Sequence, residues 1–199
     1  PTRRSSDLLL EKMGQTKMTM KKEISDDEKE RLMDELVSAI TTLSKEQTGA
    51  LITFERTQSL LDYINTGTKI NADIKSELFL TIFWEGTPLH DGATIIRRNR
   101  IHASGCVLPL TNNNSINKKL GTRHRAAMGL SENSDALVIV VSEETGVISL
   151  AVNGRLTRNY DKEKLKTILL KIMENRDAKR VKSAGEKVKT WIKGMKKEA

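Results

Sequence analysis

Residues 136–154 have the sequence ALVIVVSEETGVISLAVNG. Two apolar runs, 136–141 and 147–152, are rich in β-branched residues and are separated by the polar turn SEETG. Runs of this length and composition predict strands that are buried on both faces. The Asn153-Gly154 pair that follows is a strong signal for a tight hairpin turn. The segment therefore predicts strands that pair through short turns inside one core.

Outward from this segment, apolar runs of strand length alternate with segments of helical periodicity. We expect further strands at 50–54, 93–97 and 101–108, with a turn at Arg98-Asn99 because Asn tolerates a positive φ. We expect helices at 57–65, 74–84, 123–130 and 161–173. Interleaved helices and tightly turned strands predict an α/β fold, a mixed β-sheet flanked by helices rather than a doubly wound parallel sheet.

Residues 25–43 predict an amphipathic helix. Ser25 and Glu28 form a capping-box pair, and acidic residues occupy the first turn. One apolar stripe follows, which consists of Leu32, Met33, Leu36, Val37, Ile40 and Leu43. The stripe must be buried on something. Two interpretations remain open: packing on the helix's own domain, or an interaction and regulatory helix.

Four parts of the chain differ in character. Residues 1–24 are polar and are excluded from fold reasoning, as a segment open to processing or added for expression. Residues 25–47 are interpreted as a helical regulatory or oligomerisation segment. Residues 48–175 form the expected main domain, and residues 176–199 predict a basic C-terminal helix.

Composition excludes several classes of protein. The 199 residues are 37% hydrophobic, enough for one compact core, and no apolar run approaches the roughly 18 residues of a membrane helix. A single cysteine, Cys106, excludes a disulfide framework and a cysteine-rich zinc site, so a cytoplasmic setting is expected. The net charge of +8 lies mostly in residues 161–199, where Trp191 is the one aromatic able to stack on a base. We therefore expect a solvated basic helix rather than nucleic-acid binding.

The segment GTPLHDGA, residues 86–93, lies between an expected helix and an expected strand. Gly92 permits close approach of the backbone to a ligand. Asp91 can bind a divalent cation or accept a hydroxyl proton, and His90 is a possible metal ligand. Asp-Gly is also common in ordinary turns, so a structural interpretation stays open.

The segment GTRHRAA, residues 121–127, predicts the start of a helix with Thr122 as its N-cap. Arg123, His124 and Arg125 place cationic or potentially cationic groups where the helix dipole favours anions. A bound anion would compensate, because free backbone N–H groups and guanidinium forks together make a phosphate site. The alternative is an exposed basic turn.

The turn SEETG, residues 142–146, follows a buried strand and is either an ordinary acidic turn or a source of ligands for a nucleotide or metal. Together the three segments supply cations, a carboxylate and hydroxyls. That set suits phosphoryl or nucleotidyl transfer, which depends on positioning and charge neutralisation.

The same three segments, in this order, resemble the D-G-A, R-H-R and acidic motifs of the diadenylate cyclases. The resemblance covers about residues 45–160 and is greatest to the soluble sporulation-type branch of bacilli. It implies that two ATP molecules become cyclic di-AMP and two pyrophosphates, with Mn²⁺ or Mg²⁺ as cofactor. It also implies self-association: two domains face each other to complete the active site, and a larger homo-oligomer such as a hexamer is plausible.

The resemblance also assigns roles to residues. It implies a metal site at Asp91, which also activates the 3′-hydroxyl, and at His90, and catalytic roles for Asp91, Arg123, His124 and Arg125. It implies ATP contacts from Gly92, Ala93, Leu108, Thr122, Arg123, His124, Arg125, Ser142 and Glu144, with Leu108 beside the adenine. If the N-terminal helices restrain the enzyme, deleting residues 1–45 raises its rate.

Other functions fit parts of the same pattern. A non-catalytic sensor of adenine nucleotides would share the fold and the binding residues. A transferase that releases pyrophosphate but uses another acceptor would share the chemistry. The identity of the product distinguishes these two from the cyclase, and a steep salt dependence of affinity would indicate a nucleic-acid-binding module.

Overall fold

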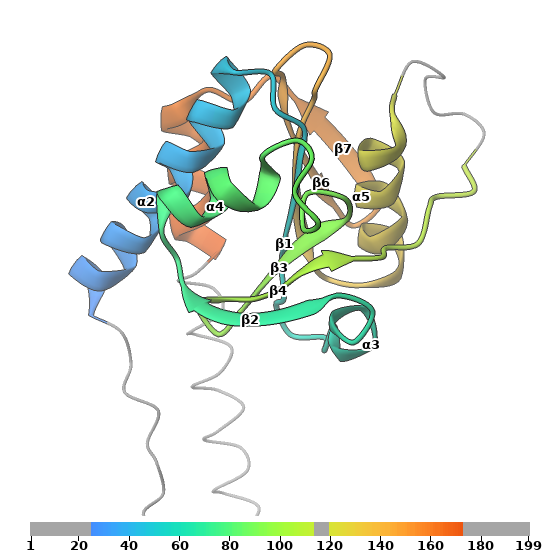
Figure 1. Ribbon diagram of the computed structural model, residues 1–199, viewed down its shortest axis with the longest axis horizontal. Coiled ribbons are helices and arrows are strands. Elements are labelled where there is room, and N and C mark those ends of the chain that lie inside the picture. Colours follow the sequence, from blue (N-terminus) through green and yellow to red (C-terminus); the bar gives the residue numbers. More distant parts are fainter. Residues whose placement is uncertain (1–24, 114–119, 173–199) are drawn as a thin grey trace, which may run out of the picture.

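The computed structural model describes residues 25–113 and 120–172, which form one seven-stranded sheet with helices on both faces (Figure 1). The strand order is β2-β4-β3-β1-β5-β6-β7. Only β1 and β3 pair in parallel among these strands, and every other neighbouring pair is antiparallel. The expected mixed sheet is therefore confirmed. The strands are β1 (Ala50–Phe54), β2 (Thr68–Asp73), β3 (Ala93–Arg97), β4 (Arg100–Cys106), β5 (Leu137–Val141), β6 (Ile148–Val152) and β7 (Arg155–Arg158).

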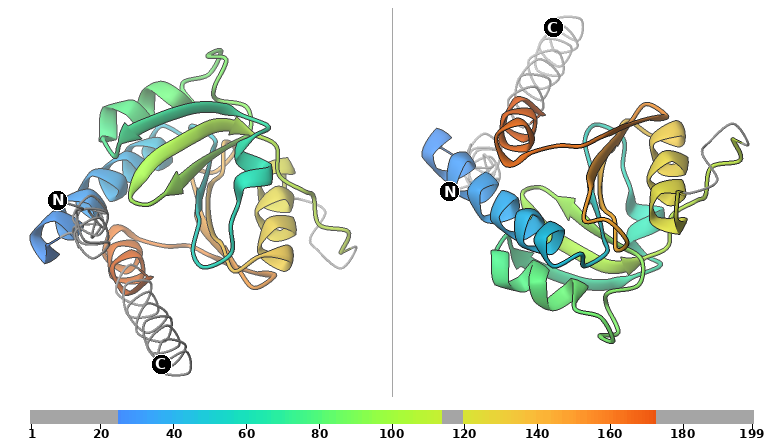
Figure 2. Two further views of the ribbon diagram at one scale, coloured as in Figure 1. Left: turned by 90° about the horizontal axis from the view of Figure 1, so that it is seen from below. Right: turned by 90° about the horizontal axis from the view of Figure 1, so that it is seen from above.

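Helices cover the sheet in two separate layers. Both views in Figure 2 place α5 (Thr122–Asn133) on the opposite side of the sheet from α2 (Asp26–Lys45) and from the helix at residues 162–172. The helix α4 (Ser76–Phe83) packs on the α2 side, and the short helix α3 (Leu61–Ile64) contributes Ile64 to the α5 side. The domain thus has three layers and a core on each face of the sheet.

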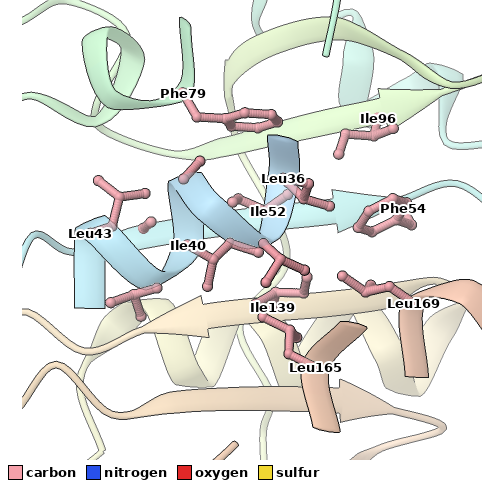
Figure 3. Packing of buried hydrophobic residues seen from close by; sticks show 14 of the residues in the cluster. Leu36, Ile40, Leu43, Ile52, Phe54, Phe79, Ile96, Ile139, Leu165 and Leu169 are labelled. Atoms are coloured by element: carbon pink, nitrogen blue, oxygen red, sulfur yellow. The ribbon is translucent and has the colours of Figure 1, made fainter. Parts of the chain in front are cut away.

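The central strands β1 and β5 are buried on both faces, which explains their unbroken apolar sequences. Side chains alternate along a strand, so neighbouring residues enter different cores. In β1, Ile52 and Phe54 face α2, whereas Leu51 faces α5. In β5, Ile139 faces α2 and Val138 faces α5. Figure 3 shows the α2 side, where Ile52 and Ile139 meet side chains from three helices.

The apolar stripe of α2 is buried in the core of its own chain. Ser25 caps the helix by accepting a hydrogen bond from the Glu28 backbone N–H at 3.2 Å, as the capping pair predicts. Leu36, Ile40 and Leu43 are at most 1% exposed and pack over the sheet (Figure 3). Of the two interpretations left open by the sequence, packing on its own domain is the one the structure contains. The stripe is not available to another subunit in this fold.

Polar contacts fix α2 to three distant parts of the chain. Near its start, Lys166 of the 162–172 helix pairs with Glu30 at 3.1 Å and with Asp34 at 2.7 Å. In its middle, Glu35 accepts from the Ser76 backbone N–H at 2.9 Å. At its end, the Ser44 hydroxyl donates to the Gly146 carbonyl at 2.6 Å. The helix is therefore an integral part of the domain and not an appended segment.

Several local expectations need correction. Strand β2 was not expected from the sequence, because an edge strand that is mostly exposed lacks an apolar run. The expected helix at 57–65 is reduced to Leu61–Ile64, because Asp135 accepts the backbone N–H groups of Thr57 and Gln58 in a turn. The hairpin turns are confirmed: Arg98 and Asn99 have φ of 54° and 61°, and Asn153 has φ of 50°.

The topology brings separated segments to one edge of the sheet, meaning the edge formed by the ends of the strands and not by an outer strand. At this edge β1 and β3 begin, β4 and β5 end, β6 begins and β7 ends, as the paired residues Ala50–Val141, Ala93–Cys106 and Ser149–Arg158 show. The loop before β3, the segment after β4 and the β5–β6 turn therefore meet there. The start of α5 reaches the same edge, because the helix runs back antiparallel to β5.

No helix in residues 25–113 and 120–172 is both long and apolar enough to span a bilayer. The expected basic helix at 176–199 and the N-terminal segment 1–24 lie outside the described residues.

Candidate functional site

A cavity of about 790 Å³ opens at this edge of the sheet. Its volume lies within the range of roughly 300–1,000 Å³ typical of small-molecule sites. Eight of the residues expected at the site line it: Asp91, Gly92, Leu108, Thr122, Arg123, His124, Ser142 and Glu144. The three expected segments thus converge on one cavity, although more than 50 residues separate the first from the last.

The loop before β3 places Asp91 at the cavity. Gly92 has a φ of 104°, and a Cβ there would lie 2.8 Å from the Gly105 carbonyl carbon and 2.9 Å from the Cys106 carbonyl oxygen. The Gly92 backbone therefore lies in close contact with the end of β4, and its expected approach to a ligand stays a prediction. Only glycine fits this position, and the tight contact fixes the adjacent Asp91. The Asp91 side chain is exposed and makes no hydrogen bond or ion pair with any described residue.

Two residues of the same loop do not line the cavity. The Nδ1 atom of His90 lies 2.5 Å from the Thr87 carbonyl oxygen, to which it donates, so the ring anchors the loop. Ala93 is fully buried at the start of β3. Their expected contacts to metal and nucleotide stay predictions.

The helix α5 begins at the cavity with its N-terminal turn. Its N-cap is Gly121 and not Thr122, and no side chain caps this end. The N–H groups of His124 and Arg125 both donate to the Gly121 carbonyl, at 3.1 and 3.2 Å. The N–H groups that precede them have no acceptor within the helix, a general property of helix starts. This uncapped end, lined by Gly121 and Thr122, suits an anion.

Arg123 lies in the cavity wall but already has a carboxylate partner. Its guanidinium donates to Glu143 in the β5–β6 turn. The pair lies against Gly49, where a Cβ would be 2.7 Å from the Arg123 Nη1. The cationic first turn of α5 is therefore partly compensated within the chain, which the sequence analysis did not foresee.

His124 is buried, with 5% of its surface exposed, and its Nε2 lies 3.4 Å from the Ser149 hydroxyl. Burial lowers the pKa of His124, and the positive charge of Arg158 lowers it further, whereas Glu144 opposes the shift. The imidazole is therefore neutral near pH 7. It provides a hydrogen-bonding group to the cavity rather than the positive charge that the pattern R-H-R allowed.

Arg125 does not line the cavity, and its expected role stays a prediction. The side chain is exposed, and its backbone carbonyl accepts from the Thr111 N–H at 3.1 Å. Consecutive helical residues are rotated by about 100°, so residues 123 and 125 point to different sides of the helix. The two arginines of the R-H-R motif therefore lie on different sides of α5.

Much of the remaining lining is apolar, and most of it comes from residues that had no expected role. Leu108 lies on the segment that follows β4, beside two exposed apolar side chains, Val107 at 67% and Leu110 at 46%. This wall can accommodate a flat apolar group such as a base. Further unassigned lining residues are Leu51, Cys106, Leu120, Ala126, Val141, Glu143, Thr145 and Arg158.

The carboxylates of the cavity fit a magnesium or manganese ion held jointly with a phosphate. Asp91 and Glu144 have no partner among the described residues, whereas Glu143 is paired with Arg123. Within the same described ranges no group of three or more metal-binding side chains exists. Mg²⁺ is commonly held by one or two carboxylates together with substrate phosphates and water. The chain thus offers hard oxygen ligands but not a complete cage.

Cys106 gives a direct probe of this wall, because it is the only cysteine in the chain. Burial raises the pKa of its thiol to about 11. At pH 8 roughly 0.1% of such a thiol is ionised, against roughly a quarter of a free cysteine thiol. We expect Cys106 to react with a thiol reagent more than a hundredfold more slowly than free cysteine, with a rate that rises about tenfold per pH unit. Unfolding in urea should restore the fast reaction, and a fast reaction of the native chain at pH 8 would contradict the buried thiol.

The fold and the cavity define a mixed α/β domain with a small-molecule site at a sheet edge, suited to a ligand with an apolar end and an anionic end. Residues 37–156, more than half of the chain, match the family model described as "DAC: DisA bacterial checkpoint controller nucleotide-binding". The chain belongs to this family of nucleotide-binding domains.

Known proteins of the same kind agree with this assignment. The chain is 49% identical over 140 residues to the cyclic di-AMP synthase CdaA of Bacillus subtilis, covering 70% of this chain and 51% of that protein. It is 50% identical over 121 residues to the diadenylate cyclase CdaS of Bacillus thuringiensis, covering 61% of this chain and 60% of that protein. The expected resemblance to diadenylate cyclases is confirmed, and CdaS is among these relatives.

A solved structure confirms the fold independently. The crystal structure of a double mutant of DacA from Staphylococcus aureus superposes with a TM-score of 0.72 at 44% identity, covering 74% of this chain and 97% of that chain. By contrast, the chain spans only between half and three fifths of the two curated relatives. The similarity therefore concerns the domain that contains the cavity.

Proposed function

We propose that this chain is a diadenylate cyclase, which condenses two ATP molecules into cyclic di-AMP with release of two pyrophosphates. One observation carries the proposal: a single cavity joins the carboxylate of Asp91, which has no partner among the described residues, the uncapped N-terminus of α5 and an apolar wall at Leu108. Two curated relatives that match the chain at 49–50% identity carry the names of this activity.

The cavity suggests how one ATP would lie in it. The adenine would lie against the apolar wall at Leu108, and the phosphates would lie at the start of α5, near Thr122 and Arg123. The N–H groups and the dipole of the helix would stabilise the negative charge that develops at the α-phosphorus. Asp91 would then be the group that accepts a proton from a 3′-hydroxyl or holds a cation close to it.

A divalent cation completes the charge balance of this site. The described lining carries three carboxylates, Asp91, Glu143 and Glu144, against two arginines, Arg123 and Arg158. A triphosphate would therefore meet repulsion without a cation. Mg²⁺ or Mn²⁺, held by Asp91 and the phosphates with Glu144 within reach of the same cavity, would supply that charge and polarise the reacting phosphoryl group.

The reaction requires two copies of the chain. Each cavity has one helix start for phosphates and one Asp91, whereas cyclisation joins two nucleotides. The 3′-oxygen of each ATP attacks the α-phosphorus of the other, each attack expels one pyrophosphate, and each 3′-hydroxyl loses one proton. Asp91 is exposed at the sheet edge, so two cavities can face each other there. We propose a face-to-face homodimer as the catalytic unit, within a larger homo-oligomer such as a hexamer.

Product analysis tests the proposal. The chain is incubated with ATP and either Mg²⁺ or Mn²⁺, and the products are separated and identified by mass spectrometry. Cyclic di-AMP and pyrophosphate in a 1:2 ratio are expected. ATP binding without any product would instead support a nucleotide sensor, and a linear or mixed adenylated product would indicate transfer to another acceptor.

A further inference from the structure

Arg158 lines the cavity from an element that none of the three motifs contains. It is the last residue of β7, an edge strand of the sheet, and its backbone pairs with Ser149 of β6. The chain reaches Arg158 only after the β6–β7 hairpin, sixteen residues beyond Ser142 at the other wall. Nothing in the sequence around it, NGRLTRNY, resembles a phosphate-binding motif.

The sheet register directs the Arg158 side chain toward α5. Residues paired across an antiparallel ladder point to the same face of the sheet. Ser149, the partner of Arg158, is fully buried, and its hydroxyl lies 3.4 Å from His124 Nε2 on α5. The charge of Arg158 also contributes to the lowered pKa of His124, which requires the guanidinium to lie near that ring.

Arg158 differs from the other arginine in the cavity, because it has no hydrogen-bond or ion-pair partner in the part of the chain that the structure describes. Arg123 is held by Glu143, so an arriving anion must compete with that carboxylate. Within residues 25–113 and 120–172, no hydrogen bond or ion pair involves the Arg158 side chain. The guanidinium of Arg158 therefore has no hydrogen-bonding role among the described residues. An anionic ligand would give it one.

We propose that Arg158 is a phosphate-binding residue, which holds the triphosphate of the bound nucleotide together with the N-terminus of α5. The nature of the ligand rests on the proposed function, whereas the position of the guanidinium rests on the sheet register. Arg158 on β7 and the N-terminus of α5 would thus bind the same triphosphate. Arg125, the second arginine of the R-H-R motif, does not line the cavity, whereas Arg158 does.

A matched pair of variants tests this proposal in the full chain. Arg158→Gln removes the charge at the cavity. Arg155→Gln removes the same charge from the same strand, but residue 155 is paired with Val152 and lies on the opposite face of the sheet. Isothermal titration with ATP and with adenosine, each with Mg²⁺, measures both variants against the unmodified chain. Arg158→Gln should weaken ATP binding at least tenfold and leave adenosine binding unchanged, Arg158→Lys should recover part of the loss, and Arg155→Gln should bind both ligands within twofold of the unmodified chain.

The outcomes separate the two proposals. ATP affinity of Arg158→Gln within twofold of that of Arg155→Gln would overturn the role of Arg158. If instead the unmodified chain binds ATP no more tightly than adenosine, the phosphate site itself is absent and the proposed function fails. A second readout checks the geometry without ligand: Arg158→Gln should raise the pKa of His124 in an NMR titration, and an unchanged His124 pKa would contradict the placement of the guanidinium beside that ring.

Discussion

Asp91→Asn is expected to lower the rate of cyclic di-AMP formation by a factor of about 100 to 10,000, the range typical for loss of a positioned general base. The amide keeps the shape of the side chain but can neither accept the 3′-hydroxyl proton nor bind a divalent cation with a full charge. The fold should be unaffected, because the Asp91 carboxylate is exposed and contacts no described residue as a hydrogen-bond or ion-pair partner. Affinity for adenosine should change little, since the apolar wall is intact.

The measurement is steady-state production of cyclic di-AMP at saturating ATP with Mn²⁺. Glu85→Gln is the matched control, because Glu85 is an exposed carboxylate in the same loop that does not line the cavity. It should retain normal turnover. If the turnover of Asp91→Asn is close to that of the control, Asp91 has no catalytic role. The proposed function would then lose its main support.

Deletion of residues 1–45 is expected to prevent folding, not to raise activity. The deletion removes α2, whose side chains Met33, Leu36, Val37, Ile40 and Leu43 are at most 1% exposed. Truncating one such residue to Ala typically costs about 2–5 kcal/mol, and the whole domain is stable by about 5–15 kcal/mol. Loss of the complete helix therefore exceeds the available stability. This outcome opposes the expectation, drawn from the sequence, that the helix is a removable restraint.

Thermal unfolding followed by circular dichroism measures this effect. A chain that lacks only residues 1–24 is the control, because the difference between the two truncations isolates α2. Single substitutions provide a milder test: Leu36→Ala should lower the free energy of unfolding by about 2–5 kcal/mol, whereas Ser38→Ala, on the exposed side of the same helix, should change it by less than about 1 kcal/mol. A cooperative transition in the 1–45 deletion, near the unfolding temperature of the control, would show that α2 is dispensable.

Elements with a strong local signal could be predicted from the sequence. The central strands β1, β5 and β6 are fully or almost fully buried, and their apolar runs predicted their position to within one residue. The hairpin at Asn153-Gly154 follows from residues that tolerate a positive φ. Edge strand β2 could not be predicted, because its pairing depends on β4 and its side chains are largely exposed.

Site residues could be predicted from the sequence motifs, but the motifs do not show which of their side chains line the cavity. Asp91, Thr122 and Ser142 were expected and line it. His90 and Arg125 were expected and do not, because the loop and the helix rotate them away. Arg158 was missed, because only the pairing of β7 with β6 brings it to the site. The hairpin turn at Asn153-Gly154 was expected, but β7 is short and mostly exposed, so its sequence gives no sign that it carries a site residue.

The contact between the start of α2 and the 162–172 helix has a consequence for how the chain is made. Lys166 and Glu30 are separated by 136 positions. At roughly 5–20 residues per second, the ribosome therefore adds Lys166 roughly 7–27 s after Glu30. Throughout that time the apolar stripe of α2 lacks Leu165 and Leu169, which complete its core. We expect nascent chains stalled before residue 165 to remain protease-sensitive and longer ones to become resistant.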